Sequence, residues 1–262
     1  MFEYLPIHIL AYLVMLFAVL GLVMGSALNC LALRLAREEK WAGNSRSACP
    51  ACGHTLTALD LIPLLSWLYL RGKCRHCHAP ISPRYPLSEA TLAAVYVCLL
   101  LKFGLTVQLI TPMIFASCLF CLSLVDLDTQ IIPDRFLVIP IVARCAELLL
   151  TGGVSLLLSG ALPGLVIAGS VLMISLVMDK ILKKDTMGGG DIKLLFVIGL
   201  FLTLPECLLM VMIACVIGIV MASLLMRVSP DTPFPFGPAL SIAAIVTMLV
   251  GAPIVNWYLG LF

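Results

Sequence analysis

Residues 188–204 read GGGDIKLLFVIGLFLTL: three glycines and an aspartate, followed by an apolar run. Asp191 stands directly before this run, in a chain that is 62% hydrophobic and only 11% charged. The mean hydropathy of +1.14 points the same way. We therefore expect an all-α polytopic membrane protein. A transmembrane β-barrel is disfavoured because the apolar stretches are continuous rather than alternating.

The apolar stretches predict about eight transmembrane helices, since a span needs about 20 mostly apolar residues. The first stretch is expected to be retained rather than cleaved, because Glu3 stands where a signal peptide would be basic. These spans predict three parts: a first transmembrane helix at 1–33, a loop at 34–87 and a seven-helix core at 88–262. The expected spans are 7–33, 88–104, 107–126, 136–151, 157–179, 192–204, 207–226 and 237–258.

The basic residues orient these spans. All lysines and arginines except Lys102 and Arg144 fall on one side of the membrane in this arrangement. The positive-inside rule makes that side cytoplasmic and places both termini on the opposite side. Asp126 and Asp191 then both lie at the cytoplasmic face, whereas one span more or fewer between them would place them on opposite sides.

Two carboxylates at this face form a candidate catalytic pair. Asp126 ends the apolar run 110–125, and Asp191 begins the later one. A carboxylate at a membrane boundary is costly unless it is solvated, paired or used. Two carboxylates that share a proton can hydrolyse a peptide bond, because one activates water while the other polarises the scissile carbonyl.

The glycines before Asp191 fit the same use. Without side chains, Gly188, Gly189 and Gly190 allow close approach of an extended substrate, and we predict that they bind it. Each feature also has a plainer interpretation. Asp191 alone fits a helix N-cap. Asp126 and Asp128 together also fit a solvated turn that ends the span. Asp128 is an alternative to Asp126 as the catalytic aspartate, although it lies further toward water.

The loop at 34–87 carries a candidate metal site. Two C-x-x-C pairs, each followed or preceded by a glycine, aim four thiolates at one tetrahedral ion. This pattern predicts structural zinc, because the loop is expected in a reducing compartment where disulfides do not persist. A redox C-x-x-C or free thiols are the alternatives. The predicted ligands are Cys49, Cys52, Cys74 and Cys77.

Between the cysteine pairs, residues 59–70 read LDLIPLLSWLYL, which is apolar but too short to span a membrane. Trp67 and Tyr69 favour a position at the membrane interface, where aromatic rings are enriched. A small hydrophobic core for the loop is the alternative.

Six motifs covering nearly the whole chain together resemble those of the type IV prepilin peptidases, the GxGD family of membrane aspartyl proteases. The double C-x-x-C loop resembles the family's zinc-binding domain. GGGDIK at 188–193 resembles the GxGD motif, and DLDTQIIPD at 126–134 resembles the first aspartate motif, in which the first Asp is catalytic. The other matches are GSALNC at 25–30 with Arg34-Leu35, RYPLSE at 84–89 and PFGP at 235–238. The resemblance favours Asp126 over Asp128.

This resemblance implies a hydrolase of the bacterial inner membrane. Such enzymes cut the short basic leader from type IV prepilins or type II secretion pseudopilins, after a Gly at the cytoplasmic face. Members with the zinc loop usually also methylate the new N-terminus with S-adenosylmethionine. Expected partners are the substrate, membrane lipid and the pilus or type II secretion machinery, but not nucleic acid. The chain carries no Rossmann-type glycine fingerprint, as expected if the methyl-donor site is unrelated to that fold, and the sequence does not indicate which residues bind the donor.

Acidic residues near the pair are candidates to attract the basic leader. Asp128, Asp134 and Asp185 have this interpretation, with simple solvation as the alternative, and Asp134 also fits the N-cap of the fourth span.

A proton- or cation-coupled transporter is the main rival function, because intramembrane carboxylates bind such ions. Transport sites usually lie near the membrane midplane, whereas these aspartates lie at one face. Arg144 and Glu147 are the only pair placed for transport, and we interpret them as an ion pair that holds helices together. A zinc-anchored scaffold without chemistry would leave the three glycines unexplained.

Overall fold

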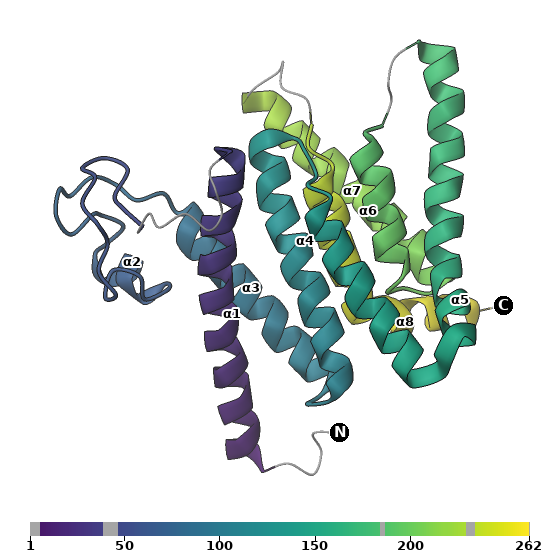
Figure 1. Ribbon diagram of the computed structural model, residues 1–262, viewed down its shortest axis with the longest axis horizontal. Helices are drawn as coiled ribbons and strands as arrows, with labels where there is room; N and C mark the ends of the chain where they lie inside the picture. The colour runs from purple at the N-terminus through teal and green to yellow at the C-terminus, as the bar shows by residue number, and fades with distance from the viewer. Residues whose placement is uncertain (1–5, 39–46, 184–186, 229–233, 262) are drawn as a thin grey trace. The chain divides into compact units, whose positions relative to one another are not determined.

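The computed structural model describes residues 6–38, 47–183, 187–228 and 234–261, with the side chains of 225–228 left aside. The described chain is helical, and its only β-structure is two isolated bridges (Figure 1), so the all-α prediction is confirmed. The elements are α1 (Ile7–Ala36), α2 (Leu65–Tyr69), α3 (Arg84–Phe103), the 3₁₀ turn η2 (Val107–Leu109), α4 (Ile110–Thr129), α5 (Arg135–Leu182), α6 (Gly189–Gly199), α7 (Leu204–Val228) and α8 (Gly237–Leu259).

Six helices of the described chain are long and apolar enough to cross a membrane: α1, α3, α4, α5, α7 and α8. The expected count of eight is close to this, and the differences lie in α5 and α6. The 48 residues of α5 cover two expected spans, 136–151 and 157–179. They are not one straight helix, because Gly153 has φ 69° and ψ −161°, and the chain reverses direction there (Figure 1).

Helix α6 is shorter than expected. It contains 11 residues and ends at Gly199, whereas the predicted span continued to residue 204. A span needs about 20 residues, so α6 is not one of the candidate spans. Residues 200–203 form the turn that leads into α7, where Glu206 accepts hydrogen bonds from the N–H and the hydroxyl of Thr203 at 2.8 and 2.7 Å.

The chain divides into two compact units, residues 1–105 and 106–262. In the first, α1 packs on α3 with the two backbones almost touching. A Cβ atom on Gly21 would lie 2.5 Å from the Cα of Ala93, and one on Gly25 would lie 2.9 Å from the Cα of Glu89. The GSALNC motif therefore begins at a close helix contact. The functional division into 1–33, 34–87 and 88–262 stays a prediction.

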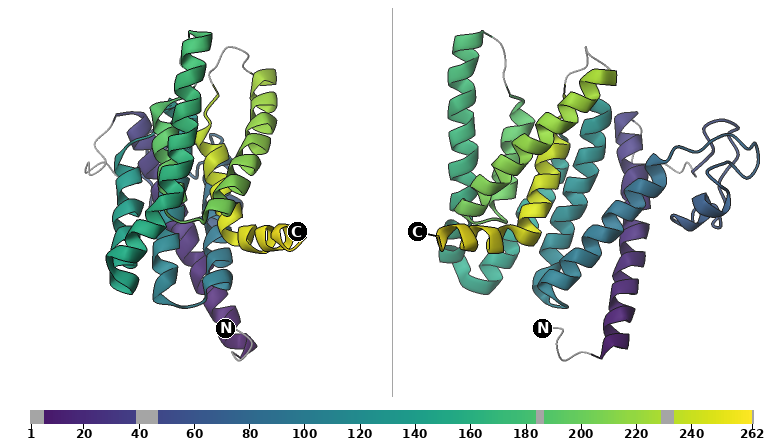
Figure 2. Two further views of the ribbon diagram at one scale, coloured as in Figure 1. Left: turned by 90° about the vertical axis from the view of Figure 1, so that its right-hand side faces the viewer. Right: turned by 180° about the vertical axis from the view of Figure 1, so that it is seen from behind.

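In the second unit, α4 packs on α5 and α8, α5 on α6, and α7 on α8. Figure 2 shows α8 beside α4 when the unit is seen from behind. Helices α5 and α6 meet at glycines: a Cβ atom on Gly164 would lie 2.6 Å from the carbonyl oxygen of Phe196. Fully buried apolar side chains fill the core, among them Phe115, Leu119, Leu194, Ile198, Met210 and Leu240.

Candidate active site

Asp126 lies in the last turn of α4 and its side chain is buried, with the residue 5% exposed. Its Oδ2 accepts a hydrogen bond of 3.0 Å from the backbone N–H of Gly237, the first residue of α8. The carboxylate therefore faces the N-terminus of another helix, where the helix dipole favours negative charge. The C-terminus of α4 disfavours negative charge, so the N-terminus of α8 offsets the unfavourable position of Asp126 in its own helix.

Asp191 is the third residue of α6, and it is not the N-cap. Gly188 holds that position without a side-chain cap, and the N–H of Asp191 donates to the carbonyl of Gly188 at 3.0 Å. Asp191 precedes the apolar run and lies outside the candidate spans. Burial, and then the negative charge of Asp126, raise the pKa of Asp191 to about 6. The negative charge of Asp126 thus disfavours ionisation of Asp191.

The two aspartate motifs meet through the glycines. A Cβ atom on Gly190 would lie 3.1 Å from the Cβ of Ile132, a residue of the DLDTQIIPD motif. A Cβ atom on Gly188 would lie 3.5 Å from Oδ2 of Asp191, and one on Gly189 would meet open space. Gly188 and Gly189 are exposed. The glycine segment therefore has one packed side and one open side next to Asp191.

The other acidic residues differ from the pair. Asp128 is exposed, whereas Asp126 is buried. Asp134 occupies the N-cap position of α5, but its carboxylate binds Lys193 of α6, with Nζ 2.8 Å from Oδ1. Asp185 lies outside the described residues.

Two contacts of this site are not predicted from the sequence: Gly237 with Asp126, and Ile132 with Gly190. The PFGP motif marks Gly237 as a motif residue before the last span, which is a usable signal, but no local pattern says which side chain it meets. Because the charge of Asp126 raises the pKa of Asp191, this arrangement disfavours simultaneous ionisation of the two carboxyl groups.

The four cysteines of the loop are brought together. Their sulfur atoms all lie within 4.8 Å of one another, and Cys49 Sγ is 3.9 Å from Cys77 Sγ. Four thiolates around one Zn²⁺, each with a bond of about 2.3 Å, would lie about 3.8 Å apart at tetrahedral angles. This donor set fits a structural zinc ion. The three nearby histidines are not part of the cluster: His54 and His76 stack on each other at 4.5 Å, and His78 is exposed.

Each cysteine pair forms the same hydrogen-bonded knuckle. In the first, the N–H of Gly53 donates to the carbonyl of Cys49 at 2.8 Å. In the second, the N–H of His78 donates to the carbonyl of Cys74 at 3.0 Å. Gly53 and His78 both have positive φ, 69° and 58°. Hydrogen bonds from the backbone of Cys52 and Ala51 lower the pKa of the Cys49 thiol to about 7, whereas the pKa of the Cys77 thiol in the same cluster is raised to about 11.

The segment at 59–70 is tied to α3 and to the knuckles. The N–H of Leu64, at φ 58°, donates to Oε2 of the buried Glu89 at 2.6 Å. The indole N–H of Trp67 donates to the carbonyl of Ile81 at 3.2 Å. Apolar side chains of this segment are nevertheless exposed, which disfavours a loop core and fits an interfacial position: Leu59, Leu61, Ile62, Leu65, Leu68 and Tyr69.

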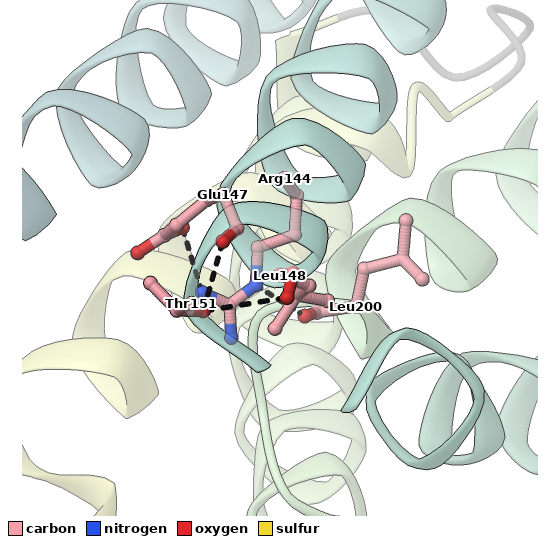
Figure 3. A network of polar contacts seen from close by, with 5 residues as sticks. All are labelled: Arg144, Glu147, Leu148, Thr151 and Leu200. Carbon is pink, nitrogen blue, oxygen red and sulfur yellow. Dashed lines mark hydrogen bonds and ion pairs between the residues drawn. The ribbon is translucent and has the colours of Figure 1, made fainter. Parts of the chain in front are cut away.

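Arg144 and Glu147 form the expected ion pair, with Nη1 2.8 Å from Oε2 (Figure 3). Arg144 also donates from Nε to the carbonyl of Leu200 at 3.0 Å, which joins α5 to the end of α6. The pair therefore has a structural role within the second unit, and nothing in the described chain supports a transporter.

Comparison with known proteins identifies the family of the chain. Residues 19–103 match the bacterial peptidase A24 N-terminal domain, and residues 113–223, which contain both aspartates, match the type IV leader peptidase family. No solved structure matches the chain.

Three curated relatives are named prepilin leader peptidase/N-methyltransferase. The protein from Aeromonas hydrophila is 36% identical over 83% of this chain and 76% of its own length. The protein from Pseudomonas aeruginosa is 32% identical over 98% of this chain and 97% of its own. The protein from Neisseria gonorrhoeae is 30% identical over 95% of each chain. Similarity of this extent establishes that the chain belongs to the type IV leader peptidase family.

Proposed function

We propose that the chain is a membrane aspartyl endopeptidase in which Asp126 and Asp191 are the catalytic pair. The observation that carries this proposal is their environment. Asp126 is buried against the N-terminus of α8, and Asp191 stands beside exposed glycines with its pKa raised by burial and by Asp126. One ionised carboxylate takes a proton from water as the water attacks the scissile carbonyl. The protonated partner donates its hydrogen bond to the carbonyl oxygen.

The substrates are type IV prepilins or type II secretion pseudopilins, cut after a Gly that precedes their apolar segment. A basic leader stays in the cytoplasm while an apolar stem lies in the bilayer, so the bond to be cut lies at the cytoplasmic face of the inner membrane. The positive-inside rule places the aspartates at this face and both termini in the periplasm. Gly188, Gly189 and Gly190 hold the extended chain around the cut, and the pilus or type II secretion machinery receives the product.

The second activity is N-methylation of the new N-terminus, as the names of the relatives indicate for those proteins. S-adenosylmethionine supplies the methyl group when it is bound, and the acceptor is the α-amine that cleavage releases. The four cysteines hold a structural Zn²⁺ that fixes the loop. Since zinc ligands of this kind leave no open coordination position, the metal takes no part in either reaction.

A cleavage assay in detergent tests the proposal, with a prepilin as substrate and the mass of the product N-terminus as readout. Asp126→Asn and Asp191→Asn abolish cleavage, whereas Asp128→Asn retains it, because only the first two remove a member of the pair. The wild-type product is one methyl group heavier than the cut form alone. Full cleavage by either of the first two variants would break the assignment of the pair.

A further inference from the structure

The helices that carry the two aspartates are joined at a second place, far from the carboxylates. Phe115 of α4 stacks on Phe201, which follows α6, with ring centroids 4.0 Å apart and an interplanar angle of 12°. Phe115 is fully buried. At about 1.5 Å per residue, Asp126 lies about 16 Å along α4 from this stack, and Asp191 lies about 15 Å from it along α6. The stack therefore fixes the end of α6 against α4 at a similar distance from each aspartate.

Arg144 holds this joint from α5. Its Nε donates to the carbonyl of Leu200 at 3.0 Å (Figure 3). Its guanidinium lies 5.5 Å from the centre of the Phe201 ring. Leu200 is the C-cap of α6, so the cation sits at the negative end of that helix and binds one of its unpaired carbonyls. The aromatic ring adds a cation–π contact.

The charge of Arg144 is balanced locally. Glu147 lies one turn away with Oε2 2.8 Å from Nη1, and the two side chains are 26% and 17% exposed. A guanidinium among apolar helices is costly unless it is paired and used. Arg144 is used to hold α6, because this helix of 11 residues is too short to span the membrane by itself.

We propose that Arg144 is a positioning residue for peptide cleavage: it anchors the C-terminus of α6 against α5 and the Phe115–Phe201 stack, and so holds Asp191 at the distance from Asp126 that the reaction requires. Arg144 touches neither the substrate nor the reacting atoms. The inference rests on the proposed role of Asp126 and Asp191 as the catalytic pair.

The test compares kcat and KM for prepilin cleavage in detergent-purified wild type, Arg144→Met, Arg144→Lys and Lys102→Met. Methylation of a synthetic, already cut N-terminal peptide is measured on the same preparations. Arg144→Met lowers kcat for cleavage by about 100-fold, the usual cost of a displacement near 1 Å, while KM and methylation change less than about threefold. Arg144→Lys recovers part of kcat, because an ammonium group can still donate to the carbonyl of Leu200.

Lys102→Met is the matched control, because Lys102 and Arg144 are the two basic residues that are not expected on the cytoplasmic side. This variant retains wild-type cleavage. A rise in KM with kcat intact in Arg144→Met overturns the proposal, because it makes Arg144 part of the binding of substrate. An equal fall of cleavage and methylation also overturns the proposal, because it indicates general damage to the fold. Unchanged cleavage in Arg144→Met overturns it as well. Cleavage that survives Asp126→Asn or Asp191→Asn refutes the proposed catalytic pair instead, whatever Arg144 does.

Discussion

Gly237 is the residue on which the position of Asp126 depends most directly. A Cβ atom at this position would lie 2.6 Å from Oδ2 and 3.1 Å from Cγ of Asp126. Both distances are shorter than van der Waals contact, so a side chain and the present position of the carboxylate exclude each other. A glycine at the start of α8 is therefore a steric requirement of the candidate active site, in addition to the hydrogen bond that its N–H donates.

Gly237→Ala is expected to lower kcat for cleavage by about 100-fold, because the methyl group displaces the carboxylate of Asp126. The cost to folding is about 1–3 kcal/mol, as for other overpacked sites, so the protein still inserts and can be assayed. Gly169→Ala is the matched control, since a Cβ atom there meets open space. Normal cleavage by Gly237→Ala would show that Asp126 can act from a different position.

Gly189 tests the proposed role of the glycine segment. A Cβ atom at Gly189 meets open space, so Gly189→Ala leaves the free protein unchanged. If the open side of the segment receives the substrate backbone, the added methyl group raises KM for prepilin by about tenfold, or about 1.4 kcal/mol of binding. Steady-state kinetics at saturating and limiting substrate separate this from a fall in kcat. An unchanged KM would remove Gly189 from the binding site.

The two cysteine knuckles form the same turn but differ in the residue that follows the second cysteine, Gly53 in one and His78 in the other. Gly53 and His78 both adopt positive φ after the second cysteine of their pair, and the left-handed region costs little only for glycine. The second knuckle therefore carries strain that the first avoids. Gly53 has no side chain and the side chain of His78 is exposed, so either residue can be replaced without disturbing packing.

His78→Gly is expected to stabilise the metal-bound loop by about 0.5–1 kcal/mol, which slows zinc release to a chelator about two- to fivefold. Gly53→Ala, at the equivalent position of the first knuckle, accelerates release. A colorimetric chelator that reports free Zn²⁺ measures both variants. The opposite order would mean that the imidazole of His78 stabilises the loop by more than its backbone conformation costs.

At the level of the complete chain, the expected orientation in the membrane follows from charge alone. The loop with the four cysteines and the ends of α4 and α6 that carry the aspartates are expected on the cytoplasmic side, with both termini opposite. Cys52 in the loop is exposed, and so is Leu261 near the C-terminus. These two positions report the two sides of the membrane.

After zinc removal, a membrane-impermeant maleimide is expected to label Cys52 in inside-out vesicles and not in right-side-out vesicles. A cysteine introduced by Leu261→Cys gives the reverse pattern. The exposed Cys98 and Cys215 lie in expected spans, so the bilayer shields them from either side. Labelling of Cys52 from the periplasmic side would invert the orientation and move the aspartates away from a cytoplasmic leader.

The sequence predicts α6 less well than the other helices. The break in α5 at Gly153 falls between the two expected spans 136–151 and 157–179. Residues 200–203, by contrast, form the turn before α7, whereas the expected sixth span continued to residue 204. Hydropathy cannot locate this helix end, because ending the helix inside a continuous apolar stretch changes backbone geometry and not composition.

The sequence by itself determined the helical membrane class, the four cysteines that gather in the loop, the expected ion pair of Arg144 with Glu147, and the two aspartates proposed as the catalytic pair. The first three depend on composition or on spacing along the chain, whereas the choice of Asp126 over Asp128 depends on the resemblance to the prepilin peptidases. Only the tertiary structure decided that Gly237 meets Asp126 across 111 positions, that Ile132 packs on Gly190, and that Phe115 stacks on Phe201. Such contacts depend on how whole helices pack, and glycines and rings that meet through packing leave no periodic signal in the sequence.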